Sequence, residues 1–183
     1  MPQDDEAEIE LMVLAKVNNQ IISPANHKSI VGIFQDSLLG SNLFSQENIS
    51  FTPLKAMNLV SKINNIDIGI FNQKQVSNFD LLTQILPPIS LEYKIKKMFK
   101  EDDDYKTSNG VLEIKNGKYI RGNIDKDVLG SSGKGLIQRI ANDFSNDKSQ
   151  QFIDSIQSIV TEYMLSRGFS VGISDLITSK ETV

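Results

Sequence analysis

The chain has 183 residues, of which 39% are hydrophobic, and its 19 basic and 23 acidic residues give a formal net charge of −4. This length supports one hydrophobic core, and the net negative charge argues against a protein that holds nucleic acid through a broad basic surface. The sequence contains no cysteine, which excludes disulfides and thiolate chemistry, and it lacks both a signal-peptide pattern and an apolar run long enough to cross a bilayer, so we expect a soluble, intracellular protein without membrane contact.

Helical patterns dominate the first half of the chain. Four helices are predicted by acidic side chains near a helix start and by apolar residues repeated every three or four positions. They cover residues 4–16, the later part of residues 30–40, residues 53–63 and residues 78–86. We expect Gly40 to cap the second helix in a left-handed conformation. The third is expected to bury a stripe formed by Leu54, Met57, Val60 and Ile63.

The second half combines strands with two further helices. Alternating apolar and polar residues predict three strands, at residues 91–95, 111–115 and 118–121. Asn116 and Gly117 separate the last two, and this dipeptide tolerates the positive φ angles of a type I′ hairpin turn. A glycine-rich loop at 130–135 precedes two helical patterns, the second of which ends at Gly168. The expected fold is therefore α+β, with helices around a small antiparallel sheet or hairpin.

The glycine-rich loop is the first segment that suggests chemistry. Successive backbone amides before a helix can bind a phosphate. A nucleotide-binding P-loop would need glycine where Val128 stands and Ser or Thr where Gly135 stands, so we do not expect an independent NTPase site.

Other polar groups invite a metal or catalytic interpretation but are incomplete. The acidic run 101–104 contains the carboxylates that divalent cations prefer, yet consecutive side chains diverge, which favours a solvated charge run. His27 is the only histidine and lies in a polar turn without a second ligand or a base partner, so we treat it as a surface residue. Gln35 and Asp36 interrupt an apolar segment, where buried polar groups need partners, and this favours a structural over a catalytic role. We assign no catalytic residue and no metal site.

Four blocks of sequence, in order, resemble the largest subunit of multisubunit DNA-directed RNA polymerases of cells and large DNA viruses. They are Pro2-Gln3 with the acidic helix that follows, Ile22–Asn26 running through Gly32–Gly40, Leu129–Ile137, and Leu165–Asp175. The resemblance covers most of the chain, whereas residues 41–105 match poorly. It implies the pore domain over residues 1–177, with residues 1–3 as the tail of the active-centre domain and residues 178–183 as the start of the funnel domain.

The resemblance also implies a function in DNA-templated transcription. The pore, or secondary channel, admits nucleoside triphosphates (NTPs) and receives the RNA 3′ end when the enzyme backtracks. In the family, the aspartate loop that holds the catalytic Mg²⁺ lies immediately before the position of Met1, so we expect the metal ligands outside this chain and no nucleotidyltransferase activity from the chain alone. A split gene and a partial chain both fit this expectation.

The implied partners are the rest of the largest subunit, the second-largest subunit, NTP and the RNA 3′ end, with template DNA only in the assembled complex. The nucleus, the cytoplasm (a viral factory) and the virion all remain open as compartments. The alternative is a non-enzymatic, stand-alone module that binds polymerase subunits or transcription factors. Exposed apolar surface would favour the first interpretation, and a sealed polar surface the second.

The resemblance finally implies candidate site residues. The family often has adjacent basic residues just before the Gly-Ser-Ser loop, and here Lys126 and Asp127 keep one positive charge and reverse the other. Lys126 is the leading candidate for a transient phosphate contact. The candidates for the channel are Lys126, Gly130, Ser131, Ser132 and Lys134. Gln35 and Asp36 are expected to brace the active-centre side.

Overall fold

The computed structural model describes residues 1–95, 99 and 104–177. The α-helices of this part are α1 (Asp5–Val13), α2 (Gln35–Phe44), α3 (Pro53–Val60), α4 (Asn78–Ile85), α5 (Lys126–Leu129), α6 (Leu136–Asp143) and α7 (Asn146–Arg167). Its strands are β1 (Ile22–Ser23), β2 (Lys28–Ser29), β3 (Ser50–Phe51), β4 (Val76–Ser77), β5 (Leu91–Lys94), β6 (Val111–Lys115) and β7 (Lys118–Arg121). Short 3-10 turns are η1 (Val17–Gln20), η2 (Ile68–Asn72) and η3 (Ile173–Leu176). The predicted α+β class is confirmed.

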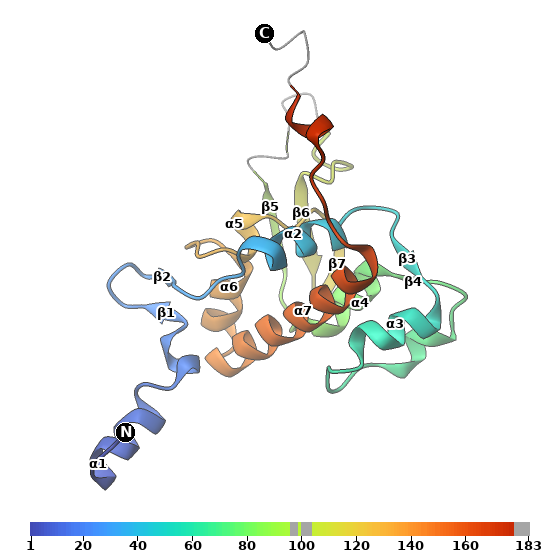
Figure 1. Cartoon of the computed structure of the whole chain (residues 1–183). Coiled ribbons are helices and arrows are strands. Elements are labelled where there is room, and N and C mark those ends of the chain that lie inside the picture. The colour runs from blue at the N-terminus through green and yellow to red at the C-terminus, as the bar shows by residue number, and fades with distance from the viewer. Residues whose placement is uncertain (96–98, 100–103, 178–183) are drawn as a thin grey trace.

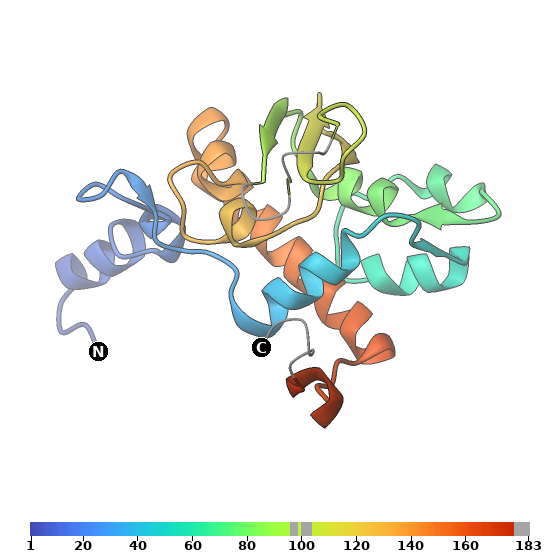
Figure 2. The same ribbon diagram turned by 90° about the horizontal axis from the view of Figure 1, so that it is seen from above.

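Helix α7 forms the centre of the molecule, and α2, α3, α4 and α6 pack against it (Figures 1 and 2). Ser145 caps its N-terminus and Gly168 ends it with a φ of 69°, as the sequence predicts for the C-terminus. The apolar residues of α7 recur at helical spacing and face the core. Those buried are Phe152, Ile156, Ile159, Val160 and Tyr163. Each buried side chain of this size contributes roughly 1.5–3 kcal/mol to folding.

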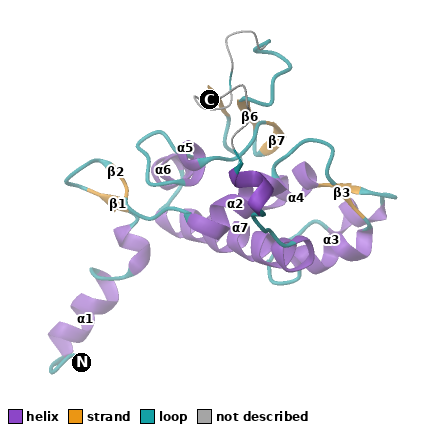
Figure 3. Cartoon of the chain, turned by 45° about the horizontal axis from the view of Figure 1, so that its top comes forward, coloured by secondary structure: helices purple, strands orange, loops and turns teal. Residues whose placement is uncertain are grey.

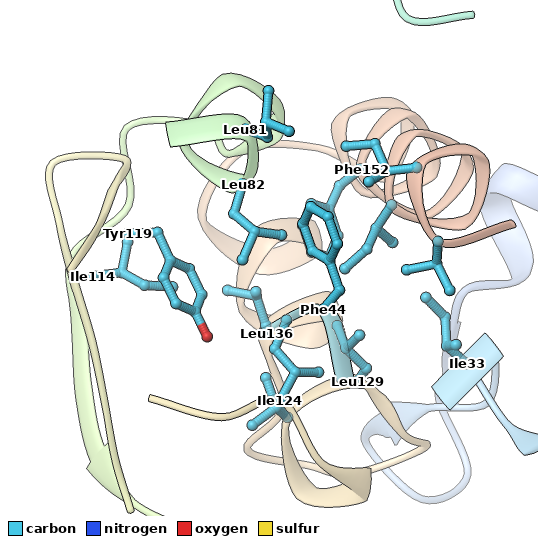
Figure 4. Close-up of a cluster of buried hydrophobic side chains, with 14 of the residues drawn as sticks. Ile33, Phe44, Leu81, Leu82, Ile114, Tyr119, Ile124, Leu129, Leu136 and Phe152 are labelled. Atoms are coloured by element: carbon cyan, nitrogen blue, oxygen red, sulfur yellow. The ribbon is translucent and has the colours of Figure 1, made fainter. Parts of the chain in front are cut away.

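The core continues from α7 into the segment that carries the channel candidates. Phe44 of α2 lies at its centre, with its ring centroid 5.8 Å from that of Phe51 and 5.2 Å from that of Tyr163. Figure 4 shows Leu129 and Leu136, which flank the glycine-rich loop, among the same buried side chains. The loop is therefore anchored in the main core at both ends.

Strands β5, β6 and β7 form an antiparallel sheet in that order. The predicted hairpin is confirmed, because Asn116 and Gly117 take φ angles of 48° and 78° between β6 and β7. Helix α4 covers this hairpin, and the Tyr119 backbone N–H donates to Thr83 Oγ1 at 3.0 Å. The sheet is thus joined to the helical layer by packing and by a hydrogen bond.

One sequence-based expectation about packing is wrong, and a second holds only for Val60 and Ile63. Gly40 does not cap α2, which continues to Phe44; it packs instead against Val160 and Met164 of α7. In α3 the buried side chains are Ala56, Leu59 and Val60, while Leu54 and Met57 are exposed. In α3 the expected stripe and the buried one both have helical spacing, and the position of α7 decides which side of the helix is buried.

The two ends of the described chain leave large apolar side chains uncovered. Helix α1 ends at Val13, three residues before the predicted boundary, and projects from the body without any buried residue (Figure 3). The segment after α7 likewise exposes its large apolar side chains. The exposed apolar residues at the two ends are Ile9, Leu11, Met12, Val13, Leu14 and Val17, and Phe169, Val171, Ile173, Leu176 and Ile177. Residues 178–183, expected to begin the next domain, lie outside the described residues.

Candidate functional site

The structure brings two of the family-like segments into direct contact. The Ile33 backbone N–H, just before α2, donates to the Leu129 carbonyl at 2.8 Å. A Cβ on Gly32 would lie 2.8 Å from the backbone N of Ser131 and 2.9 Å from the carbonyl carbon of Gly130. Only glycine permits this approach without displacing the backbone. The start of α2 and the glycine-rich loop therefore form one surface.

Lys126 begins the short helix α5 and is exposed. Asp125 caps this helix, because its Oδ1 accepts from the backbone N–H groups of Asp127 at 2.8 Å and Val128 at 3.1 Å. Val128 and Leu129 at the other end of α5 are buried. The lysine therefore stands on a helical turn that is fixed by a cap and by two apolar anchors, next to the half-buried carboxylate of Asp127.

The loop from Gly130 to Gly135 directs several of its amides at its own oxygens. The Ser132 N–H donates to the Gly130 carbonyl at 2.8 Å, and the Lys134 N–H donates to Ser132 Oγ at 3.2 Å. Ser131 Oγ donates to the carbonyl of Ser29 in β2. This geometry supports a fixed loop rather than a phosphate cradle, and it leaves the exposed side chain of Lys134 as the loop's cation.

Gln35 and Asp36 form the first turn of α2 and are exposed. The expectation of buried polar groups is wrong here, because Ile33 and Gly40 face the interior while the helix start faces outward. The carboxylate of Asp36 suits a helix N-terminus. Gln35 has a φ of 50°, which is uncommon for a residue with a side chain. The structure places both residues on the helix whose lead-in contacts the loop.

Two residues near the end of α2 also reach this site, and the sequence analysis missed them. Asn42 Nδ2 donates to the Ile124 carbonyl at 2.9 Å, and the Ile124 N–H donates to Ser45 Oγ at 2.7 Å. Ile124 is two positions before Lys126. No local pattern signals these contacts, since Asn and Ser at the end of a helix are ordinary surface residues in sequence.

A depression of about 560 Å³ opens beside the loop, between β5 and α6. Its lining includes Lys94, Lys134, Gln138 and Arg139. Arg139 Nε pairs with Asp143 at 3.0 Å, and the Lys94 ammonium lies 4.2 Å from the centroid of the Phe99 ring. The Gln138 side chain accepts from the Ser29 N–H and donates to the His27 carbonyl. The polar groups of the depression are thus largely committed to the fold.

Tyr93 of β5 also lines this depression. Burial raises the pKa of its hydroxyl, and the nearby carboxylates of Asp125 and Asp127 raise it further. Among the described residues this buried hydroxyl has no hydrogen-bond partner. The phenol therefore stays neutral and adds no charge beside Lys126.

The remaining candidates do not join the site. His27 is exposed in the β1–β2 turn, as expected. Of the acidic run, Glu101, Asp102 and Asp103 lie outside the described residues, while Asp104 Oδ1 accepts from the Lys106 N–H at 3.0 Å. In the part of the chain that the structure describes, no cluster of three or more His, Cys, Asp or Glu side chains is placed to hold a metal ion. Within the same residues, no helix has the length and apolar content to span a membrane.

Comparison with known proteins matches this chain to one family. The family model described as RNA polymerase Rpb1, domain 3, matches residues 20–176. DNA-directed RNA polymerase subunit Rpo1N of Methanococcus vannielii is 28% identical over 96% of this chain and 21% of its own length. DNA-directed RNA polymerase subunit 1 of Acanthamoeba polyphaga mimivirus is 26% identical over 99% of this chain and 11% of its own length. Human DNA-directed RNA polymerase III subunit RPC1 is 24% identical over 96% of this chain and 14% of its own length. The chain thus spans about a fifth or less of these relatives.

Proposed function

This chain belongs to the family of domain 3 of Rpb1, the largest subunit of RNA polymerase, and on that premise we propose that it forms part of the pore of a DNA-directed RNA polymerase. In this role its surface around Lys126 lines the secondary channel, where NTP enters and the RNA 3′ end is received during backtracking. We propose the pore domain over residues 1–177 and the start of the funnel domain at 178–183.

The contact between the lead-in of α2 and the glycine-rich loop is the observation that carries this proposal. The hydrogen bond from Ile33 to Leu129 and the close approach of Gly32 to Ser131 join the two segments. The backbone of Lys126 is thereby held on a fixed surface, so on meeting a phosphate only its exposed side chain loses conformational freedom, and the backbone of the loop does not. Gln35 and Asp36, on the same surface, are the residues that we propose brace the active-centre side.

The exposed apolar ends favour a part of a larger assembly over a sealed, stand-alone module. Large uncovered apolar patches mark surfaces that other protein chains bury. We propose that the rest of the largest subunit and the second-largest subunit cover α1 and the segment 169–177. The nucleotidyltransferase reaction and its Mg²⁺ would then be supplied by the assembled polymerase, with metal ligands outside this chain and template DNA held by the complex.

Lys126→Ala in the assembled polymerase tests the function. We would purify the enzyme that contains this chain and measure KM and kcat for NTP in template-dependent RNA synthesis, together with the rescue of backtracked complexes. An exposed charge contact contributes about 0.2–1 kcal/mol, so KM should rise by a factor of about 1.4 to 5. Because the contact is transient, kcat should change little.

The exposed Lys62, just beyond the end of α3, provides the matched control. Lys62→Ala removes the same charge next to α3, which Figure 1 shows well apart from α5, and it should leave KM unchanged. An equal rise in both variants would indicate a general charge effect. No change in the Lys126→Ala enzyme would refute the channel role of this residue, and failure of the chain to co-purify with polymerase subunits would refute the assembly itself.

A further inference from the structure

The segment that delivers Lys126 has no regular structure of its own. Residues 122–125 connect β7 to α5 and belong to neither a helix nor a strand. Helix α5 has four residues, a length at which a helix is not stable by itself. The position of Lys126 therefore depends on what holds residues 122–125.

Gly122 and Asn123 are hydrogen-bonded to Asn109, whereas the part of the segment next to Lys126 is held by the end of helix α2 through both backbone polar groups of Ile124. The Ile124 carbonyl accepts from Asn42 Nδ2 at 2.9 Å, and the Ile124 N–H donates to Ser45 Oγ at 2.7 Å. Ser45 is fully buried and Ile124 is 1% exposed, so water does not replace these bonds easily. Ser45 Oγ also donates to the Asn42 carbonyl at 3.0 Å, which ties the two anchors together.

The same helix is tied to the far side of Lys126. The lead-in to α2 contacts α5 and the loop through the Ile33–Leu129 hydrogen bond. Lys126 thus lies between two attachments to α2, one at Ile124 and one at Leu129. A displacement of α2 would carry Lys126 with it.

We propose that Asn42 and Ser45 are positioning residues that set the place of Lys126 on the channel surface. This inference rests on the proposed function, in which Lys126 meets phosphate groups. The ligand class is a triphosphate or an RNA backbone phosphate, and the two residues act on it only through Lys126.

A double-mutant cycle in the assembled polymerase tests the inference. Asn42→Ala should raise KM for NTP by up to about five-fold, the limit set by the exposed contact that it misplaces, with kcat unchanged. In the Lys126→Ala background, Asn42→Ala should produce no further rise, because the cation that it positions is absent. An undiminished effect in that background would overturn the inference.

Hydrogen exchange separates a failure of positioning from a failure of the proposed function. In the assembled polymerase, Asn42→Ala should speed exchange of the backbone amides of residues 124–130. Thr83→Val is the control, since it too removes a single side-chain hydrogen bond to the backbone of a distant segment, in this case to the Tyr119 N–H in β7. Exchange at 124–130 no faster than in the control would refute the positioning role even if Lys126→Ala raised KM. If exchange at 124–130 is faster but Lys126→Ala leaves KM unchanged, the positioning role of Asn42 is confirmed and only the channel function is refuted.

Discussion

Replacement of Gly40 by alanine should destabilise the fold, although alanine in a helix interior is normally favoured over glycine by about 1 kcal/mol. A Cβ at this position would lie 2.5 Å from Val160 Cγ1 and 2.8 Å from Met164 Cγ. Met164 can bend away, but Val160 is β-branched and buried within α7, so its χ1 has little freedom. Overpacking costs roughly 1–3 kcal/mol. The stiff neighbour favours the upper part of this range, and we expect a net loss of about 1–2 kcal/mol.

Urea denaturation followed by circular dichroism measures this effect on the free energy of unfolding. Val160→Ala removes the opposing methyl groups, so Gly40→Ala should be neutral or stabilising in that background, with a coupling energy of at least about 1 kcal/mol. Gly133→Ala is the control, because a Cβ there meets its nearest atoms at 3.8 Å. Additive effects of Gly40→Ala and Val160→Ala, or a Gly40→Ala variant as stable as the parent, would refute the assigned packing.

Two further predictions concern the sheet. Tyr119→Phe leaves the buried Gly122 carbonyl without the hydroxyl that donates to it at 2.6 Å, so the free energy of unfolding should fall by about 1–2 kcal/mol in urea denaturation; no loss would contradict this hydrogen bond. The second prediction concerns the dependence of stability on pH. Lys115 and Arg121 hold the pKa of Glu113 below its ordinary value. The two ion pairs therefore stabilise the fold fully when the pH is above the ordinary pKa of a glutamate, and this stabilisation is lost as the pH falls through the lowered pKa. The stability difference between the parent chain and Glu113→Gln should therefore be largest near neutral pH and vanish in acid, and a difference independent of pH would contradict the pairing.

Elements that depend on local chemistry were predictable from the sequence. The Asn116-Gly117 turn forms because this dipeptide accepts positive φ angles between two alternating segments. The end of α7 at Gly168 likewise follows from one residue's conformational freedom. Gly40 shows the limit, since a glycine that ends a helix and a glycine that admits a neighbouring helix look the same in sequence.

The candidate site was predictable only in part for the same reason. The residues before and within the glycine-rich loop could be chosen from the family resemblance. The hydrogen bonds from Asn42 and Ser45 to Ile124 could not, because they join segments far apart in the chain through side chains that carry no motif. The outward placement of Gln35 and Asp36 was missed because the apolar pattern around them does not state which side of a helix start faces the core.

The charge around Lys126 fits a surface that ligands pass over rather than one that retains them. Lys126 is followed by a carboxylate at Asp127, and the nearby Arg139 is paired with Asp143. The local charge is therefore a balance between one or two exposed lysines and the carboxylates of Asp125 and Asp127, and each lysine can contribute about 0.2–1 kcal/mol to a phosphate contact. In the proposed channel such weak contacts would guide a triphosphate without delaying it, since a stronger site would lengthen its residence in proportion to the affinity gained. If the channel proposal holds, a precise position matters more than a large charge, and the two attachments of α2 on either side of Lys126 would then determine how well it meets a phosphate.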